Sequence, residues 1–423
     1  MTSPARTPTG ACPGSNPLRL AGLLALLVLA GCSSGPAPSA PSQPGQVTRP
    51  GGQPPRPAVS SVDLHPVPFS RVQGWRQTDA QSALMAFVRS CERIEQRPAH
   101  EPMNPRVRYA GAAGDWREVC LQAALLSGMG AGPNDARRFF ERNFTPVEVE
   151  GSGRLTGYYE PVVEVSASPT PEFSMAIRGL PGDLLTGDLG QFIAGLEGQR
   201  VVGRAADRQF IPYQSRAEIE AQNLGVPLAW GRPIDVFFLQ IQGSGRLTYP
   251  DGSEARVRFA AHNGRPYVSI GRILIDRGEL SPHNASKQDI ENWLLMRGPQ
   301  AWRPLFDENP RYVFFTLDSL DDPTEGPIGA QGAPLTPMAS LAVDAAHHAW
   351  GVPVVLNARI HGEPDWTGLV ITQDAGGAIT GPARGDLFFG WGYEAGERAG
   401  RQNDPAARWT LLLPNELAAR QVR

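Results

Sequence analysis

Two aspartates near the C-terminal end of the sequence combine residue types that can transfer a proton. Asp374 opens a glycine-rich loop, and Asp386 follows that loop directly before Leu387-Phe388-Phe389. A carboxyl group at the edge of an apolar run loses hydration, which raises its pKa and lets it stay protonated near neutral pH. Asp374 lies among polar and small residues, where we expect it to be ionised. Such an unequal pair suits the cleavage of a glycosidic bond, because the departing oxygen must receive a proton.

The same pattern also has a structural interpretation. Acids beside glycines are common turn formers. Asp374 would then cap a turn and Asp386 would face solvent. Taken alone, the residues and their spacing leave both interpretations open.

Aromatic and amide side chains recur in segments that would suit a sugar-binding groove. Aromatic rings stack on the C–H faces of pyranoses, and amides bond to their hydroxyl groups. The alternative is that most of these residues belong to the core of alternating strands. The candidates are Tyr158-Tyr159-Glu160, Phe237-Phe238 with Gln240 and Gln242, Tyr267 and Trp391.

Composition and motifs exclude several other classes of protein. The formal net charge of −3 gives no reason to expect a nucleic-acid partner. The seven histidines are scattered, and the sequence contains no HExxH, CxxC or phosphate-binding loop. We therefore expect no metal and no cofactor.

The N-terminus has the features of an export signal. An apolar run at positions 20–31 is too short to span a membrane comfortably and predicts a signal peptide over 1–31. It ends in Leu29-Ala30-Gly31-Cys32, which resembles the lipobox of bacterial lipoproteins, so we expect Cys32 to carry lipid. An ordinary cleaved signal is the alternative. Positions 33 and 34 lack the aspartate of an inner-membrane retention signal, which favours the outer membrane, facing the periplasm.

Residues 32–65 are rich in proline, with glycine, serine and glutamine between the prolines. Such a segment buries too little apolar surface to fold, and we expect a disordered tether. Beyond it, Cys91 and Cys120 are the two cysteines left, both on apolar helix faces. In an oxidising compartment they are candidates for a disulfide, with two buried free thiols as the alternative.

The periodicity of the mature chain predicts helices first and strands later. Helix signals begin at Thr78-x-x-Gln81, at 115–127 and at Asn134, and return at Ser215 and Ser286. From Gly151 onward the segments are β-rich and alternating, including 234–249 and 253–275. The expected fold is mainly β with helices.

Five segments together resemble one known family. They are LTGYYEPVVEVS, FFLQIQGSGRL, YVSIGRILIDRGE, RYVFFTL and QDAGGAITGPARGDLFFGWGYEAGERAG, which span about residues 75–415 in order. The family is that of membrane-bound lytic murein transglycosylase A, family 102 of the glycoside hydrolases. The resemblance implies a double-psi β-barrel domain with a second, small β domain inserted into it and a groove between them. By position, the barrel would comprise 75–160 and 319–417, and the insertion 161–318.

The resemblance also implies roles for single residues. Asp386 matches the catalytic acid, Asp374 its close neighbour, and Asp344 a third, structural aspartate. The substrate-binding positions carried by the matching segments are Tyr158, Tyr159, Glu160, Gln240, Gln242, Gly243, Ser244, Ser269, Gly376, Gly377 and Trp391.

The implied reaction is cleavage of the β-1,4 bond from N-acetylmuramic acid to N-acetylglucosamine in peptidoglycan strands, with formation of a 1,6-anhydro ring. Asp386 would act first as acid and then as base. The rivals are an inverting hydrolase that uses both Asp374 and Asp386, and a non-catalytic, expansin-like wall-binding lipoprotein.

Overall fold

The computed structural model describes residues 64–151, 153–196, 199–360 and 363–421. The predicted signal peptide, Cys32 and nearly all of the predicted tether lie outside the described residues. Within the described ranges, no helix has the length and apolar character needed to cross a membrane.

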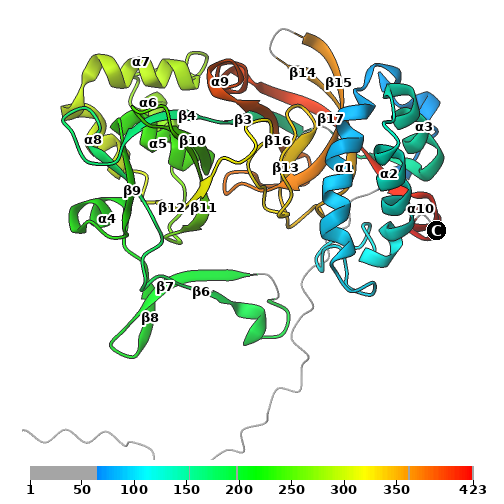
Figure 1. The fold of residues 1–423 in the computed structure, drawn as a ribbon, viewed down its shortest axis with the longest axis horizontal. Helices are drawn as coiled ribbons and strands as arrows, with labels where there is room; N and C mark the ends of the chain where they lie inside the picture. The colour runs from blue at the N-terminus through cyan, green and yellow to red at the C-terminus, as the bar shows by residue number, and fades with distance from the viewer. Residues whose placement is uncertain (1–63, 152, 197–198, 361–362, 422–423) are drawn as a thin grey trace, which may run out of the picture. The chain divides into compact units, whose positions relative to one another are not determined.

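Six strands close on themselves to form a barrel (Figure 1). β3 (Gly153–Glu160) pairs with both β16 (Arg384–Trp391) and β17 (Asn403–Pro414), so the two ends of the order β17-β14-β15-β13-β16-β3 meet. The other members are β13 (Ser340–Val343), β14 (Pro353–Ile360) and β15 (Glu363–Asp374), while β1 (Leu64–Pro66) and β2 (Phe144–Val149) extend the sheet beyond β17. The predicted barrel is confirmed.

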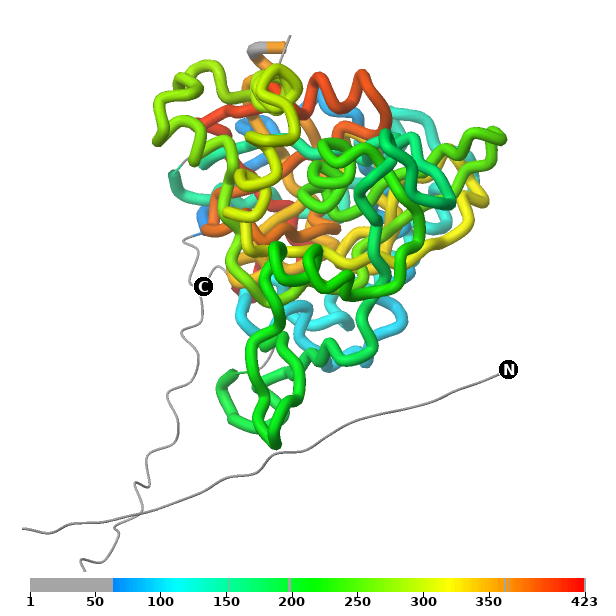
Figure 2. The backbone as a smooth tube through the Cα atoms, turned by 90° about the vertical axis from the view of Figure 1, so that its left-hand side faces the viewer, coloured from blue at the N-terminus to red at the C-terminus, as the bar shows by residue number. Residues whose placement is uncertain are grey.

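A second set of sheets lies between β3 and β13 in the chain, as expected for an inserted domain. One sheet has the order β12-β11-β10-β4-β9-β5, and an isolated bridge from Gly179 to Phe315 brings its two edges together. The other sheet, β6-β7-β8, projects away from the first in both views (Figures 1 and 2). The strands are β4 (Val162–Ser166), β5 (Met175–Arg178), β6 (Leu185–Asp188), β7 (Arg200–Ala206), β8 (Gln209–Pro212), β9 (Pro227–Gly231), β10 (Ser244–Thr248), β11 (Glu254–His262) and β12 (Val313–Ser319).

Among the described residues, three α-helices precede the barrel and cover part of it. They are α1 (Ala80–Glu95), α2 (Arg117–Gly128) and α3 (Pro133–Asn143). Asp79 caps α1, one residue after the predicted Thr78, by accepting a hydrogen bond from the backbone N–H of Ser82. A disulfide joins Cys91 of α1 to Cys120 of α2, so the predicted pairing is present.

Parts of two predicted β-rich segments in the second half of the chain are helices. α5 (Pro233–Gln242) and α6 (Ile270–Asp276) replace parts of the expected β-rich segments. α5 has Pro233 in its first turn and ends at Gly243 in the left-handed conformation, which are a start and a stop signal for a helix. The predicted helices after Ser215 and Ser286 are confirmed as α4 (Arg216–Gln222) and α7 (Lys287–Arg297). α8 (Pro299–Asp307), α9 (Gly392–Arg401) and α10 (Asn415–Gln421) were not predicted.

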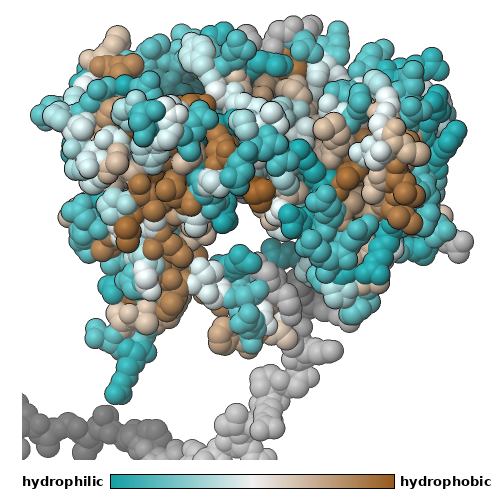
Figure 3. Space-filling model, viewed as in Figure 1, coloured by the Kyte–Doolittle hydropathy of each residue, from teal (hydrophilic) through white to brown (hydrophobic). Residues whose placement is uncertain are grey.

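Apolar side chains inside the barrel and beneath α1 form one large core, and the inserted domain has smaller cores of its own. On the face shown in Figure 3, apolar side chains also gather over the inserted domain, beside a hollow at the centre of the view.

Candidate active site

Asp374 and Asp386 lie on either side of one short strand. Ala342 of β13 pairs with Asp374 of β15 on one side and with Asp386 of β16 on the other. Because neighbouring strands are about 4.8 Å apart, the Cα atoms of the two aspartates are separated by roughly 10 Å. The barrel thus brings together two acids that the sequence places at opposite ends of a loop.

Tyr158 of β3 shows that the two carboxyl groups face the same region. Its hydroxyl donates a hydrogen bond of 2.9 Å to Asp374 Oδ2. Burial raises the pKa of Tyr158 well above its usual value, and the charges of Asp374 and Asp386 both add to the increase. Tyr158, predicted to contact substrate, therefore lies beside both acids.

The surroundings of Asp386 combine burial with one positive charge. Burial raises the pKa of Asp386, and the guanidinium of Arg384, at 2.7 Å, opposes that rise without cancelling it. Its side chain keeps 20% of its surface exposed, so the carboxyl group remains accessible. Arg384 was missed by the sequence analysis, although residues two apart on a strand share a face.

The alternation of side chains along β16 also corrects the expectation that the whole apolar run Leu387-Phe388-Phe389 lies beside Asp386. Phe388 shares the face of Asp386, and its ring lies 5.2 Å from that of Tyr158. Leu387 points to the opposite face, into the barrel core. Of Leu387 and Phe388, only Phe388 therefore contributes apolar surface next to the carboxyl group of Asp386.

Asp374 accepts three hydrogen bonds. Oδ1 accepts from the backbone N–H groups of Ala330 at 2.8 Å and Ala375 at 2.9 Å, and Oδ2 accepts from Tyr158. The expected polar setting is present, and these donors favour the ionised form. Burial nevertheless raises the pKa of Asp374 above its usual value, and the charge of Asp386 adds to the increase. The simple expectation of an ordinary ionised acid missed this effect of burial.

A bulge in β15 positions Asp374. The register between β13 and β15 shifts so that Leu341 pairs with Thr372 but Ala342 pairs with Asp374. The intervening Gln373 is fully buried, and its amide donates to Ala86 O and Ser90 Oγ of α1, both at 2.9 Å. Helix α1 thus holds the bulge in place, and the bulge sets the direction of the Asp374 side chain.

Asp344 holds the loop between the two acids. Its Oδ1 accepts from the backbone N–H of Ala346 at 2.9 Å, and its Oδ2 accepts from that of Gly381 at 2.7 Å. Buried His348 bonds through Nε2 to Pro382 O at 2.6 Å and through Nδ1 to the Tyr109 hydroxyl at 3.0 Å. Burial lowers the pKa of His348 to about 4, so it is neutral and donates to Pro382.

Glu160 was predicted to bind substrate, and the structure corrects this. Its side chain is fully buried and forms ion pairs with Arg246 at 2.9 Å and Arg256 at 2.7 Å. All of its acceptor capacity faces protein, so we assign it a structural role. Trp391, another predicted contact, stacks under the Arg246 guanidinium at 4.2 Å and stays partly exposed.

The other predicted binding residues lie in three regions. Gly376 and Gly377 are exposed in the loop after Asp374. Tyr159, Gln242 and Ser269 line a cavity of about 240 Å³ between β3, α5, α7 and α9. Since Tyr159 and Tyr158 are consecutive in β3, this cavity lies on the opposite face of the strand from the acids. Gln240 is buried against Arg216, Gly243 caps the C-terminal end of α5, and Ser244 is the first residue of β10.

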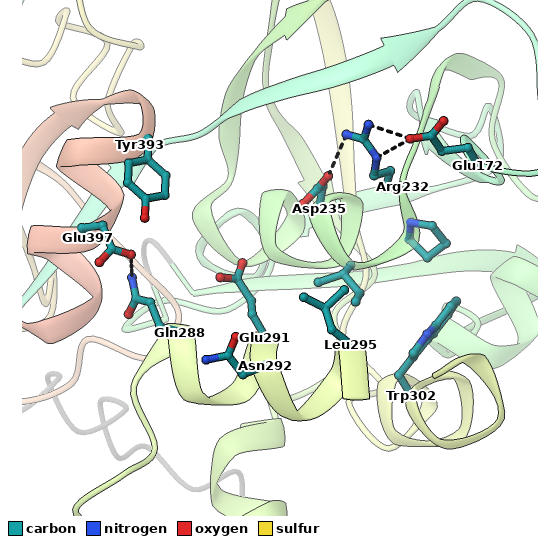
Figure 4. A pocket seen from close by; sticks show the side chains of 12 residues that line it. Glu172, Arg232, Asp235, Gln288, Glu291, Asn292, Leu295, Trp302, Tyr393 and Glu397 are labelled. Atoms are coloured by element: carbon teal, nitrogen blue, oxygen red, sulfur yellow. Dashed lines mark hydrogen bonds and ion pairs between the residues drawn. The ribbon is translucent and has the colours of Figure 1, made fainter. Parts of the chain in front are cut away.

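A larger cavity of about 630 Å³ contains neither acid of the pair (Figure 4). Tyr393 and Glu397 of α9 face Gln288 and Glu291 of α7 across it. Arg232 bonds to Glu172 at its far side, and Glu397 accepts from Gln288 at 2.7 Å. Glu172 is paired with Arg232 and Glu291 with Lys287. Among the described residues, no group of three or more His, Cys, Asp or Glu could hold a metal ion.

Comparison with known proteins supports the assignment of the fold. Residues 154–316 match the MltA specific insert domain, and residues 339–412 match the 3D domain. The chain is 28% identical over 404 residues to membrane-bound lytic murein transglycosylase A of Vibrio cholerae, which covers 94% of this chain and 95% of that protein.

Two solved structures are similar over most of their length. One is a membrane-bound lytic murein transglycosylase from Agrobacterium tumefaciens, with 32% identity and a TM-score of 0.75, covering 85% of this chain and 99% of that one. The other is Escherichia coli MltA with bound chitohexaose, with 26% identity and a TM-score of 0.57, covering 79% of this chain and 89% of that one.

A closed barrel with paired carboxyl groups and an inserted β domain, matched over nearly whole relatives, defines a lytic transglycosylase that acts on peptidoglycan. The chain belongs to the family of membrane-bound lytic murein transglycosylase A. The non-catalytic, expansin-like alternative is therefore wrong.

Proposed function

We propose that Asp386 is the single general acid and base of a reaction that leaves a 1,6-anhydro-N-acetylmuramic acid end. Protonated Asp386 gives its proton to the glycosidic oxygen as the bond to C1 breaks. The C6 hydroxyl of the same muramyl residue attacks C1, and Asp386, now ionised, takes the hydroxyl proton. The carboxyl group thus returns to its starting state.

One observation supports this role most strongly. Asp386 is an accessible carboxyl group whose pKa burial raises, and it lies one strand away from a second acid. A raised pKa keeps the proton available near neutral pH. The attacking hydroxyl is part of the substrate, so its effective concentration is high and no second catalytic carboxylate is required.

Asp374 acts as the supporting neighbour in this proposal. Three hydrogen bonds hold its carboxylate in place. Because two like charges disfavour each other's ionisation, its negative charge would help keep the proton on Asp386. It would also stabilise positive charge that develops at C1 as the bond breaks.

Replacement of Asp386 by Asn tests the proposal. We expect Asp386→Asn to keep the fold and to lose activity by roughly 100-fold or more, because an amide cannot supply the proton. The measurement is mass spectrometry of muropeptides released from purified sacculi, with circular dichroism as the control for folding. Products of the wild-type enzyme should be one water lighter than reducing ends. Full turnover by folded Asp386→Asn, or reducing-end products, would contradict the proposal, and the latter would favour the inverting hydrolase.

We further propose that the glycan strand of peptidoglycan binds over the barrel face that carries Asp374 and Asp386, and over the loop after Asp374. The contacts would come from Tyr158, Gly376, Gly377 and Trp391. Tyr158 contacts Asp374, and the two glycines leave the loop open to a bulky ligand.

We propose the same domain limits as predicted from the sequence. The barrel domain comprises residues 75–160 and 319–417, and the inserted domain comprises residues 161–318.

We propose a lipid anchor at Cys32 and an outer-membrane location facing the periplasm. The support is the lipobox-like sequence Leu29-Ala30-Gly31-Cys32 and the membrane-bound relatives. Cys32→Ser should move the protein from the membrane fraction to the soluble periplasmic fraction, with unchanged activity on sacculi. Retention of Cys32→Ser in the outer-membrane fraction after a high-salt wash would contradict the anchor.

A further inference from the structure

Arg311 of the inserted domain lies against the loop that follows Asp374. It precedes β12, and its guanidinium lies beside Gly377. A Cβ atom added to Gly377 would be only 3.0 Å from Arg311 Nη2. Gly377 itself is exposed and only three positions after Asp374. A positive charge from one domain therefore lies next to the acid-bearing loop of the other.

This guanidinium has no acidic partner in the described part of the chain. Its hydrogen bond runs from Nη1 to Arg265 O, at 3.3 Å. Other partly buried arginines near the site are paired: Arg256 with Glu160, and Arg384 with Asp386. Arg311 is only partly buried, so most of its five N–H donors remain available.

The groups around Arg311 do not compensate its charge. Burial and the charge of Arg311 lower the pKa of neighbouring His262 to about 4, so that imidazole is neutral. Arg265 contributes a second guanidinium, which bonds to Tyr213 O. A desolvated cation without a counter-ion is costly, unless a ligand supplies the opposite charge.

We propose that Arg311 binds a carboxylate of the glycan strand, beside the acid site. The proposal rests on peptidoglycan as the substrate. In strands without peptides, the lactyl group of N-acetylmuramic acid carries a free carboxylate; in strands with peptides, the stem carries carboxylates. The guanidinium fork matches either one with two parallel hydrogen bonds. A chitin oligosaccharide has no carboxylate and cannot use this contact.

The test compares binding of neutral and carboxylate-bearing glycans to Arg311→Gln in an Asp386→Asn background, which prevents turnover during the measurement. The probes are chitohexaose, peptide-free glycan strands and peptide-bearing strands, measured by calorimetry. We expect Arg311→Gln to weaken binding of a carboxylate-bearing strand by about tenfold or more and to leave chitohexaose unchanged. Weaker binding of peptide-free strands would identify the lactyl carboxylate as the group that Arg311 binds. Weaker binding of peptide-bearing strands alone would identify a carboxylate of the peptide stem.

Two further variants provide the controls. Arg272→Gln removes an exposed arginine of the same domain, paired with Asp276, and should bind all three probes as the parent does. Arg311→Lys keeps the charge and should retain part of the preference for carboxylate-bearing strands. Unchanged binding by Arg311→Gln, or an equal loss for chitohexaose, overturns the proposal. Failure of the proposed reaction would show separately, as wild-type products without anhydro ends.

Discussion

At the scale of single residues, two opposing influences decide when Asp386 carries its proton. Burial raises its pKa, and the guanidinium of Arg384 lowers it. The charge of Asp386 raises the pKa of Asp374. Because repulsion between two carboxylates is mutual, ionised Asp374 should in turn disfavour ionisation of Asp386. The general acid must be protonated to work, so this pKa sets the alkaline limit of activity.

Arg384→Gln should therefore shift the alkaline limb of the pH–activity profile upward. Without the positive charge, ionised Asp386 is less stable, its pKa rises, and the proton is kept to higher pH. Asp374→Asn removes a negative charge and should shift the same limb downward. The measurement is kcat/KM against pH on soluble glycan strands, with Arg384→Lys as the charge-preserving control. Shifts of the two variants in the same direction would contradict this account.

At the scale of elements, the loop between β15 and β16 depends on the segment that follows β13. Asp344 holds Gly381, and His348 holds Pro382, so the loop is fixed at two successive residues. Gly381 has a φ of +107°, a conformation that a residue with a side chain would adopt only under strain. We therefore expect the third aspartate, Asp344, to act on catalysis by holding the loop and not by contact with substrate.

Asp344→Ala should lower kcat more than it raises KM. The change leaves the N–H groups of Ala346 and Gly381 without their acceptor, which should cost about 1–3 kcal/mol of the free energy of unfolding. Urea denaturation and steady-state kinetics measure the two effects. Asp344→Asn, which keeps one acceptor oxygen, should lie between Asp344→Ala and the wild type. A variant with wild-type kcat would show that the anchor is dispensable.

The same scale shows what could be predicted from the sequence. Helices with a clear capping residue, such as Ser215 and Ser286, were predicted correctly because the cap depends on neighbours in sequence. The segment that became α5 was predicted as a strand, since short apolar runs fit either structure. Pro233 and Gly243 were the signals that would have decided it.

The acid site could be predicted only where its residues are close in sequence. Asp374 and Asp386 are near in sequence, and the glycines between them indicate a loop that brings them together. Glu160 was misassigned because its partners, Arg246 and Arg256, are 86 and 96 positions away. Arg311 gives no local signal at all, since its position against Gly377 arises only when the two domains pack.

At the scale of the whole molecule, a buried ion-pair network connects the barrel with the inserted domain. Glu160 ends β3 of the barrel, while Arg246 and Arg256 belong to β10 and β11 of the insertion. Both arginines also donate to Glu325 O, in the segment that returns the chain to the barrel. This network fixes the inserted domain, and with it Arg311, relative to the strands that carry the acids.

Glu160→Ala should destabilise the protein strongly. It leaves two arginines in a buried setting without their counter-ion, and removal of one partner of a buried pair costs about 3–5 kcal/mol. The free energy of unfolding, from guanidinium denaturation, is the measurement. The matched control is Asp318→Ala, which removes the partner of Arg258 in an ion pair between β11 and β12 that is 44% and 39% exposed. An exposed pair contributes only about 0–1 kcal/mol. If Glu160→Ala were no more destabilising than Asp318→Ala, the ion-pair network would not be what fixes the inserted domain against the barrel.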